Sequence, residues 1–141
     1  MLAPNHDQEI PEMTVEVAQA AFPKGNGVMK IRDELGPLFK DAEFAALYPK
    51  IGQPAESPAR LALVTILQFM ENLTDREAAD AVRSRIDWKY LLGLELTDAG
   101  FHYSVLSEFR QRLLEHGEEN ILLNRILEQC ISAGLLIGQS K

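Results

Sequence analysis

The sequence predicts an all-α fold, a multi-helix domain with no sheet, and three observations support this prediction. Apolar residues recur at helical spacing along most of the chain, and no segment is a convincing strand. Helix-start and helix-stop residues separate the apolar stretches into about eight expected helices. The 141 residues are 46% hydrophobic, which is enough to build the core of one domain.

The N-terminal part is expected to form a tail and three short helices. Residues 1–11 contain two prolines and few apolar groups, so we expect a disordered or loosely held tail. The short helices should each end at glycine or proline, and they cover residues 14–22, 28–35 and 41–48. Thr14 and Asp41 are the expected caps of the first and third helices, because their side-chain oxygens can accept from helix-start amides.

The next helix should be the central one of the domain. Ser57 is an expected N-cap, and Pro58 follows it at the first helical position, where proline is favoured. The helix should run to about Asn72 and is apolar on most of its circumference. A helix that is apolar nearly all round lies buried inside its domain.

Two helices are expected between residues 74 and 93. Thr74 and Glu77 have the spacing of a capping box, in which each side chain accepts from the other residue's amide. The helix that they open should extend to Ile86. Asp87 is then expected to cap a shorter helix, which Gly93 ends.

The last two helices are expected at residues 104–116 and 120–133, after a loop with a turn at residues 98–100. The first of them has two serines at its start, an apolar stripe on one side and two arginines one turn in. This is the layout of a helix that packs on a core and can touch a polyanion with its other face. Cys130, in the second, is expected to be a small buried residue.

The charge distribution limits the possible partners. A net charge of -7 argues against unspecific attraction to nucleic acid over the whole surface. Most arginines lie in residues 58–117, however, which allows a local basic face. No apolar run approaches the roughly 18 residues of a membrane span, and no secretion signal begins the chain, so we expect a cytoplasmic protein without membrane partners.

A catalytic site is not expected. His6, His102 and His116 have no second histidine, cysteine or carboxylate at metal-ligand spacing, so we expect neither a metal nor another cofactor. The carboxylates lie at helix starts or on polar faces, where they serve as caps and solvated charges. The Gly25-Asn26-Gly27 stretch lacks the lysine and helix-entry glycine of a phosphate-binding loop.

A nucleic-acid contact is better supported. Helix 74–86, the bend at 87–93 and helix 104–116 are expected to form a helix-turn-helix-like cluster, although the connection is long for that motif. Hydroxyls and amides at a helix start can bind phosphate, as can nearby cations. The candidate DNA-binding residues are Ser104, Ser107, Arg110, Arg112, Arg83, Arg85 and Lys89. In the alternative interpretation, the arginines pair on the surface with Glu108, Glu115, Asp80 and Asp87.

Five blocks of sequence carry a family resemblance. They are Gly52-Gln53-Pro54, the apolar helix 59–70, and the stretches 73–78 (LTDREA), 85–94 (RIDWKYLLGL) and 101–110 (FHYSVLSEFR). In this order and spacing they resemble the InsH-like N-terminal domain of bacterial DDE insertion-sequence transposases. The resemblance covers about residues 35–134.

The resemblance implies an all-helical DNA-binding or assembly region that precedes a ribonuclease-H-like catalytic domain. Residues 12–134 would be this domain, and residues 135–141 would be a truncated lead-in to the catalytic one. No position matches a catalytic carboxylate of the family, so the chain is expected not to be an enzyme. Many relatives have a polar or basic residue where this chain has Glu108, which counts against a phosphate contact at that turn.

Two functions follow as expectations. The first is recognition of transposon-end DNA, the terminal repeats, by the N-terminal domain of a transposase. The second is a protein-interaction module that joins transposase protomers into a homo-oligomer and touches DNA little. Helix 120–133 is the expected interface for the second function.

Overall fold

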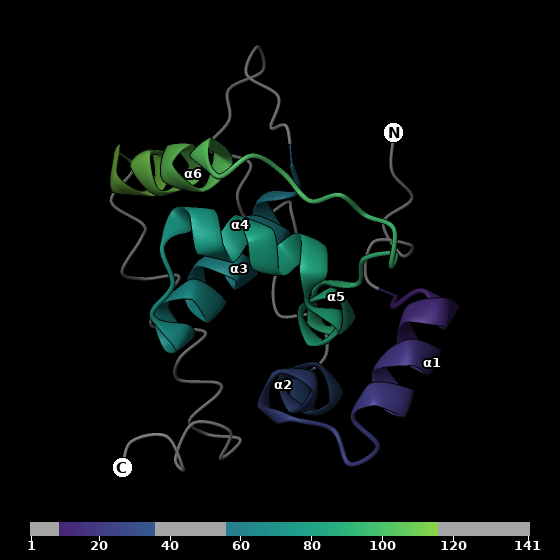
Figure 1. Ribbon diagram of the computed structural model, residues 1–141. Helices are drawn as coiled ribbons and strands as arrows, with labels where there is room; N and C mark the ends of the chain where they lie inside the picture. Colours follow the sequence, from purple (N-terminus) through teal and green to yellow (C-terminus); the bar gives the residue numbers. More distant parts are fainter. Residues whose placement is uncertain (1–8, 36–55, 116–141) are drawn as a thin grey trace.

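The computed structural model describes residues 9–35 and 56–115, which form six α-helices and contain no strand (Figure 1). The predicted all-α class is therefore confirmed for this part of the chain. The helices are α1 (Glu12–Ala21), α2 (Gly27–Leu35), α3 (Pro58–Glu71), α4 (Asp75–Ser84), α5 (Ile86–Leu92) and α6 (Ser104–Glu115). The expected helices 41–48 and 120–133, Cys130 and most of the N-terminal tail lie outside the described residues.

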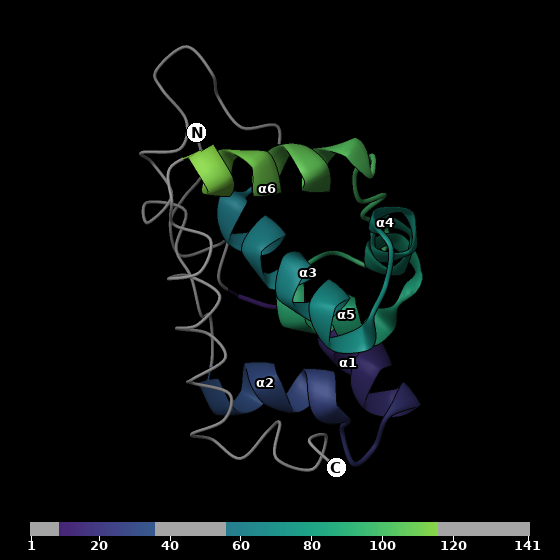
Figure 2. The same cartoon turned by 90° about the vertical axis from the view of Figure 1, so that its left-hand side faces the viewer.

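Helix α3 is the centre of the fold, as its apolar circumference predicts. The Ser57 hydroxyl accepts from the Arg60 amide at 3.3 Å, and Asn72 ends the helix in a left-handed conformation with φ 58°. Leu61, Val64 and Leu67 are almost completely buried. Helix α3 contacts α4 and α6, and Figure 2 shows α6 lying across one end of it.

Helices α1 and α2 make most of their contacts with α5, and Val28 and Ile31 of α2 also join the apolar core around α3. Their shared apolar cluster is built on Ala18, Met29 and Tyr90. The prediction that Thr14 caps α1 is wrong, because the helix begins at Glu12 and Thr14 is fully buried inside it. The Thr14 hydroxyl instead donates to the Leu94 carbonyl at 2.7 Å, which ties α1 to the end of α5.

The boundary between α4 and α5 also differs from the prediction. Helix α4 ends at Ser84, and Ile86 already begins α5, so Asp87 is not a cap but a residue of the first turn. Asp87 is buried, and its carboxylate accepts from the Trp88 amide, the Arg85 guanidinium and the Asn26 side chain. Burial alone would raise the pKa of Asp87, but these bonds together lower it.

The other end of α5 is closed by two arginines from distant helices. Arg32 donates to the Leu91 carbonyl at 3.0 Å, and Arg60 donates to the Leu92 carbonyl at 3.2 Å. These carbonyls have no partner within the helix, and cations near a helix C-terminus also interact favourably with its dipole. Gly93 then ends α5 in the left-handed region with φ 70°, as predicted.

Helix α4 begins with the predicted capping box. The Thr74 oxygen accepts from the Glu77 amide at 3.1 Å, and Glu77 accepts from the Thr74 amide at 2.9 Å. Helix α4 contacts both α5 and α6, which supports the expected cluster of three helices. No specific helix-turn-helix motif is identified in residues 9–35 and 56–115.

Candidate nucleic-acid interface

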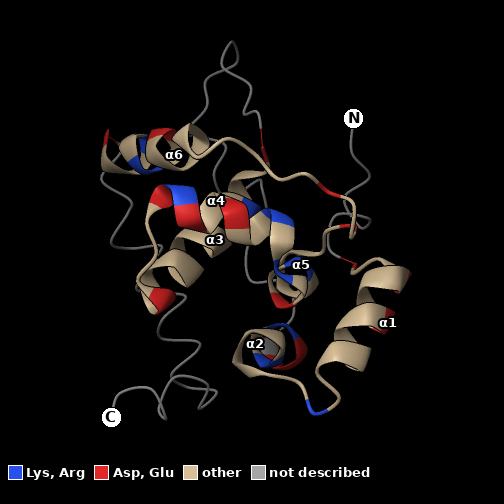
Figure 3. Cartoon of the chain, in the orientation of Figure 1, with Lys and Arg blue, Asp and Glu red and all other residues tan. Residues whose placement is uncertain are grey.

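One side of α4 is polar and faces solvent. Arg76, Asp80 and Arg83 are spaced by four and three residues, so they lie on the same side of the helix. The side chains of Arg83 and Asp80 are 56% and 60% exposed. The opposite side is buried and consists of Ala78, Ala79, Ala81 and Val82. Figure 3 shows both basic and acidic residues along α4.

The segment that leads into α6 runs along the edge between the buried and the polar side of α4. A Cβ placed on Gly100 would lie 3.8 Å from the Cβ of Arg83 and 3.4 Å from Cγ1 of Val82. Gly100 has φ +76°, so a larger residue would also be strained there. Further along, the Tyr103 hydroxyl accepts from Arg76 at 3.0 Å. The segment therefore connects the two arginines of α4.

Aromatic stacking orders the end of this segment. The Cζ atom of Arg76 lies 4.4 Å from the centroid of the Tyr103 ring. The His102 ring stacks on Tyr103, with centroids 4.2 Å apart and planes at 28°. A guanidinium over an aromatic face is attracted by the negative charge of the π-system. We use "the α4 face" for the surface made by Arg76, Asp80, Arg83, His102, Tyr103, Ser104 and Ser107.

His102 caps α6. Its Nδ1 atom accepts from the Ser104 amide at 3.2 Å and lies 2.9 Å from the Ser104 hydroxyl oxygen. The amides of Val105 and Leu106 donate to the carbonyls just before the helix. These first amides of α6 are thus already bonded and are not free for a phosphate. The Ser107 hydroxyl, which donates to the Ser104 carbonyl at 2.9 Å, is exposed.

Arg110 and Arg85 are predicted DNA contacts that the structure places in internal ion pairs. Arg110 donates to both oxygens of Asp75, at 2.7 and 2.8 Å, and this bond raises the pKa of Arg110. Arg85 donates to Asp87 and Glu71, and these bonds raise the pKa of Arg85 above its usual value. Both guanidinium groups hold helices together.

Lys89 is even less accessible. It is only 3% exposed, and its ammonium donates to the Asp98 carbonyl at 2.7 Å. Burial lowers the pKa of Lys89. The ammonium would have to leave this carbonyl before it could reach a DNA phosphate.

The remaining predicted residues have different positions. Ser104, Ser107 and Arg83 lie on the α4 face, where Arg83 forms an exposed ion pair with Asp80 at 2.6 Å. Arg112 is half-buried in α6. The alternative interpretation, pairing on the surface, is confirmed for Arg83 with Asp80. Arg85 does pair with Asp87, but that carboxylate is buried rather than on the surface, and Arg110 pairs with Asp75 instead of the carboxylates named in the alternative.

Sequence reasoning missed three residues of the α4 face: Arg76, His102 and Tyr103. A signal for Arg76 was present, because a spacing of seven residues places it on the same side of a helix as Arg83. His102 and Tyr103 directly precede Ser104, which is one of the predicted contacts. Their contact with Arg76 could not be derived from local sequence.

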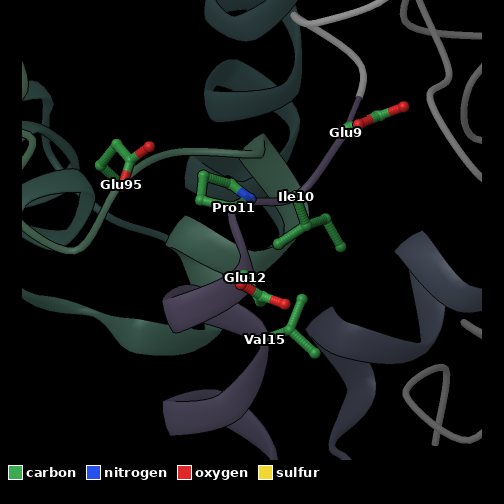
Figure 4. A pocket seen from close by; sticks show the side chains of 6 residues that line it. All are labelled: Glu9, Ile10, Pro11, Glu12, Val15 and Glu95. Carbon is green, nitrogen blue, oxygen red and sulfur yellow. The ribbon is translucent and has the colours of Figure 1, made fainter.

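The hollow in Figure 4 lies elsewhere, at the start of α1. It is lined by Ile10, Pro11, Val15 and three carboxylates, those of Glu9, Glu12 and Glu95. Its acidic rim repels a polyanion, so it does not extend the candidate interface. Within residues 9–35 and 56–115, no three histidine, cysteine or acidic side chains are grouped as a metal site requires. No helix in the same residues is long and apolar enough to cross a membrane.

Comparison with known proteins identifies a family for this chain. A family described as "Transposase domain (DUF772)" matches residues 16–112. The match includes most of α1, the whole α4 face and most of α6, and it begins earlier than the resemblance noted from the sequence blocks. No curated protein and no solved structure matches the chain.

Proposed function

The chain belongs to the transposase domain family DUF772, and from this premise we propose that it binds transposon-end DNA as a recognition and assembly domain. The observation that carries the proposal is the α4 face. This face brings two exposed arginines, a histidine and two serine hydroxyls to one side of the domain. Arginine, histidine and serine side chains are hydrogen-bond donors, which is what phosphate oxygens require.

The spacing of the two arginines suits a DNA backbone. Arg76 and Arg83 are separated by two turns of α4, or about 10 Å along its axis. Duplex DNA carries one negative charge per roughly 1.7 Å of its axis, so the two guanidinium groups would meet different phosphates. The ion pair of Arg83 with Asp80 is exposed and contributes little to stability, so a phosphate can replace Asp80.

We assign some of the predicted residues to DNA contacts and others to the scaffold of the fold. The proposed DNA contacts are Ser104, Ser107, Arg83 and Arg112, to which the α4 face adds Arg76 and His102. Three other predicted residues are assigned to the scaffold because their charged groups form part-buried bonds that join separate parts of the fold: Arg110, Arg85 and Lys89.

The test is a titration of the 141-residue chain with a fluorescent duplex. The duplex carries the terminal inverted repeat of the transposon, and a shuffled duplex of equal length is the comparison. We expect tighter binding to the repeat, with an affinity that falls steeply as salt increases. Arg83→Ala should weaken binding about fivefold and reduce the salt slope by about one unit.

Lys30→Ala is the matched control. It also removes one exposed positive charge, but from α2, which Figures 1 and 2 show away from α4 and α6. Its binding should equal that of the unchanged chain. Equal affinity for the repeat and the shuffled duplex would remove sequence recognition from the proposal. Undetectable binding at low salt would remove the DNA role of this chain.

A second candidate function is assembly of transposase protomers through apolar contacts. Two large apolar side chains support it, because Phe69 on α3 is 74% exposed and Leu114 on α6 is 54% exposed. The predicted interface 120–133 lies outside the described residues. Light scattering should give a mass above that of the monomer, and Phe69→Ser should lower it. A monomer at high concentration would count against assembly.

A further inference from the structure

We propose that Tyr103 is a positioning residue, which holds the Arg76 guanidinium ready for a phosphate of the DNA backbone. The inference rests on the proposed DNA-binding function and adds a role for a residue that is not itself a contact. The arginines of this fold are held in different ways.

Arg76 is an exposed arginine whose observed partner is neutral. Arg83, Arg85 and Arg110 each form an ion pair with a carboxylate. Among the described residues, Arg76 forms none and is held by the Tyr103 hydroxyl and ring. A neutral partner orients the guanidinium without cancelling its charge. The charge therefore stays available to an anion.

The contact also leaves donors free. A guanidinium has five N–H donors, and the hydroxyl of Tyr103 takes one from Nη2. A phosphate needs two in the parallel geometry that arginine prefers. By contrast, Arg110 uses Nη1 and Nη2 on the two oxygens of Asp75.

The Tyr103 ring is itself fixed in place. The backbone carbonyl of Tyr103 accepts from the Leu106 amide at 3.1 Å, and this bond anchors the Tyr103 backbone at the first turn of α6. The His102 ring stacks on it, and His102 is in turn bonded to the Ser104 amide. A long side chain that is ordered before binding loses less conformational entropy when it binds. The affinity gain attributed to Tyr103 comes from this ordering.

A double-mutant cycle on the 141-residue chain tests the inference with the terminal-repeat duplex. Arg76→Ala should weaken binding about fivefold and reduce the salt slope by about one unit, as expected for one lost phosphate contact. Tyr103→Phe removes the hydroxyl but keeps the ring, so binding should weaken about threefold with the salt slope unchanged. With Arg76→Ala already present, Tyr103→Phe should have no further effect.

A second measurement follows the positioning without DNA. Nitrogen-15 relaxation of the Arg76 Nε–H group should show a more mobile side chain in Tyr103→Phe than in the unchanged chain. Tyr103→Leu, which also removes the ring, should increase this mobility further. Unchanged mobility in both variants would overturn the positioning role.

The outcomes separate this inference from the function on which it rests. If Arg83→Ala weakens binding and Arg76→Ala does not, the inference is wrong and the DNA-binding proposal stands. If Tyr103→Phe weakens binding equally with and without Arg76, Tyr103 acts independently of Arg76 and the inference is wrong. If the unchanged chain does not bind the duplex at all, both proposals fail.

Discussion

Asp75 and Arg110 form a two-point ion pair between the first turn of α4 and the middle of α6, with bonds of 2.7 and 2.8 Å. The two residues are 35 positions apart in the sequence. Asp75 also accepts from Gln68 of α3 at 2.8 Å, so one carboxylate joins three helices. This carboxylate holds the start of α4 and the middle of α6 in the arrangement that forms the α4 face.

Breaking this pair should destabilise the domain. Arg110→Lys keeps the charge but loses the two-pronged geometry, and we expect it to lower the free energy of unfolding by about 1–2 kcal/mol. Urea denaturation measures the effect. Arg83→Lys is the matched control, because its ion pair with Asp80 is exposed and should change stability by less than about 0.5 kcal/mol. Equal effects of the two variants would contradict the structural role of Arg110.

The free energy of unfolding should depend on pH through the carboxylates of Asp75 and Asp87. The bonds from Arg110 and Gln68 lower the pKa of Asp75 although burial opposes this, and the pKa of Asp87 is also lowered. A carboxylate with a lowered pKa in the folded state stabilises it above the unfolded pKa, about 3.9. This stabilisation should therefore be lost as pH falls below about 4, measured as a falling Tm. Asp75→Asn should have a lower Tm than the unchanged chain at neutral pH, and its Tm should fall less as the solution is acidified. If its Tm falls as much as that of the unchanged chain, Asp75 is not the source of the acid dependence.

Tyr90 should titrate unusually late. Burial and its bond to Asp33 raise the pKa of Tyr90 to about 12. Because the unfolded chain releases this proton near pH 10, stability should fall as pH rises from about 10 to 12. The difference in absorbance at 295 nm between the unchanged chain and Tyr90→Phe isolates this titration. A midpoint near 10 would mean that the hydroxyl is not held as described.

The cap of α6 can be tested by substitution at one position. His102→Ala removes the acceptor for the Ser104 amide and should cost about 1 kcal/mol of stability. His102→Asp keeps an acceptor of the kind that helix starts prefer, so it should be at least as stable as the unchanged chain. It also places a negative charge on the α4 face, so DNA binding should weaken although stability does not. Thermal unfolding and the duplex titration measure the two effects separately, and equal stability of both variants would rule out the cap.

Metal-dependent DNA cleavage by this chain is not expected. Strand cleavage of this kind uses clustered carboxylates to hold divalent metals beside the scissile phosphate. Residues 9–35 and 56–115 contain no such group, and only the transposase domain itself is matched. Magnesium or manganese should neither nick a terminal-repeat duplex nor raise the Tm. Nicking by the pure chain that disappears when one of its own carboxylates is changed would overturn this prediction.

Local sequence was sufficient wherever the interacting groups are close along the chain. Ser57, the Thr74 and Glu77 pair, and Gly93 act as predicted, because a cap bonds amides or carbonyls within a few residues. The apolar circumference of α3 likewise predicted its burial, since that property depends only on the order of side chains around one helix.

Tertiary structure decided what local pattern left open. Thr14 and Asp87 have the side chains of caps, yet folding brings each against a distant partner, 80 residues away for Thr14 and 61 for the Asn26 contact of Asp87. Lys89 has the charged side chain of a surface contact, but it is buried and its ammonium donates to the Asp98 carbonyl. A side chain's chemistry sets which groups it can bind, whereas its burial depends on how the helices pack. The sequence by itself therefore determined the six described helices and most of their ends, because those depend on neighbours along the chain. Only the packing of the helices against one another decided which arginines are held by carboxylates of other helices, as Arg85 is by Glu71 and Arg110 by Asp75.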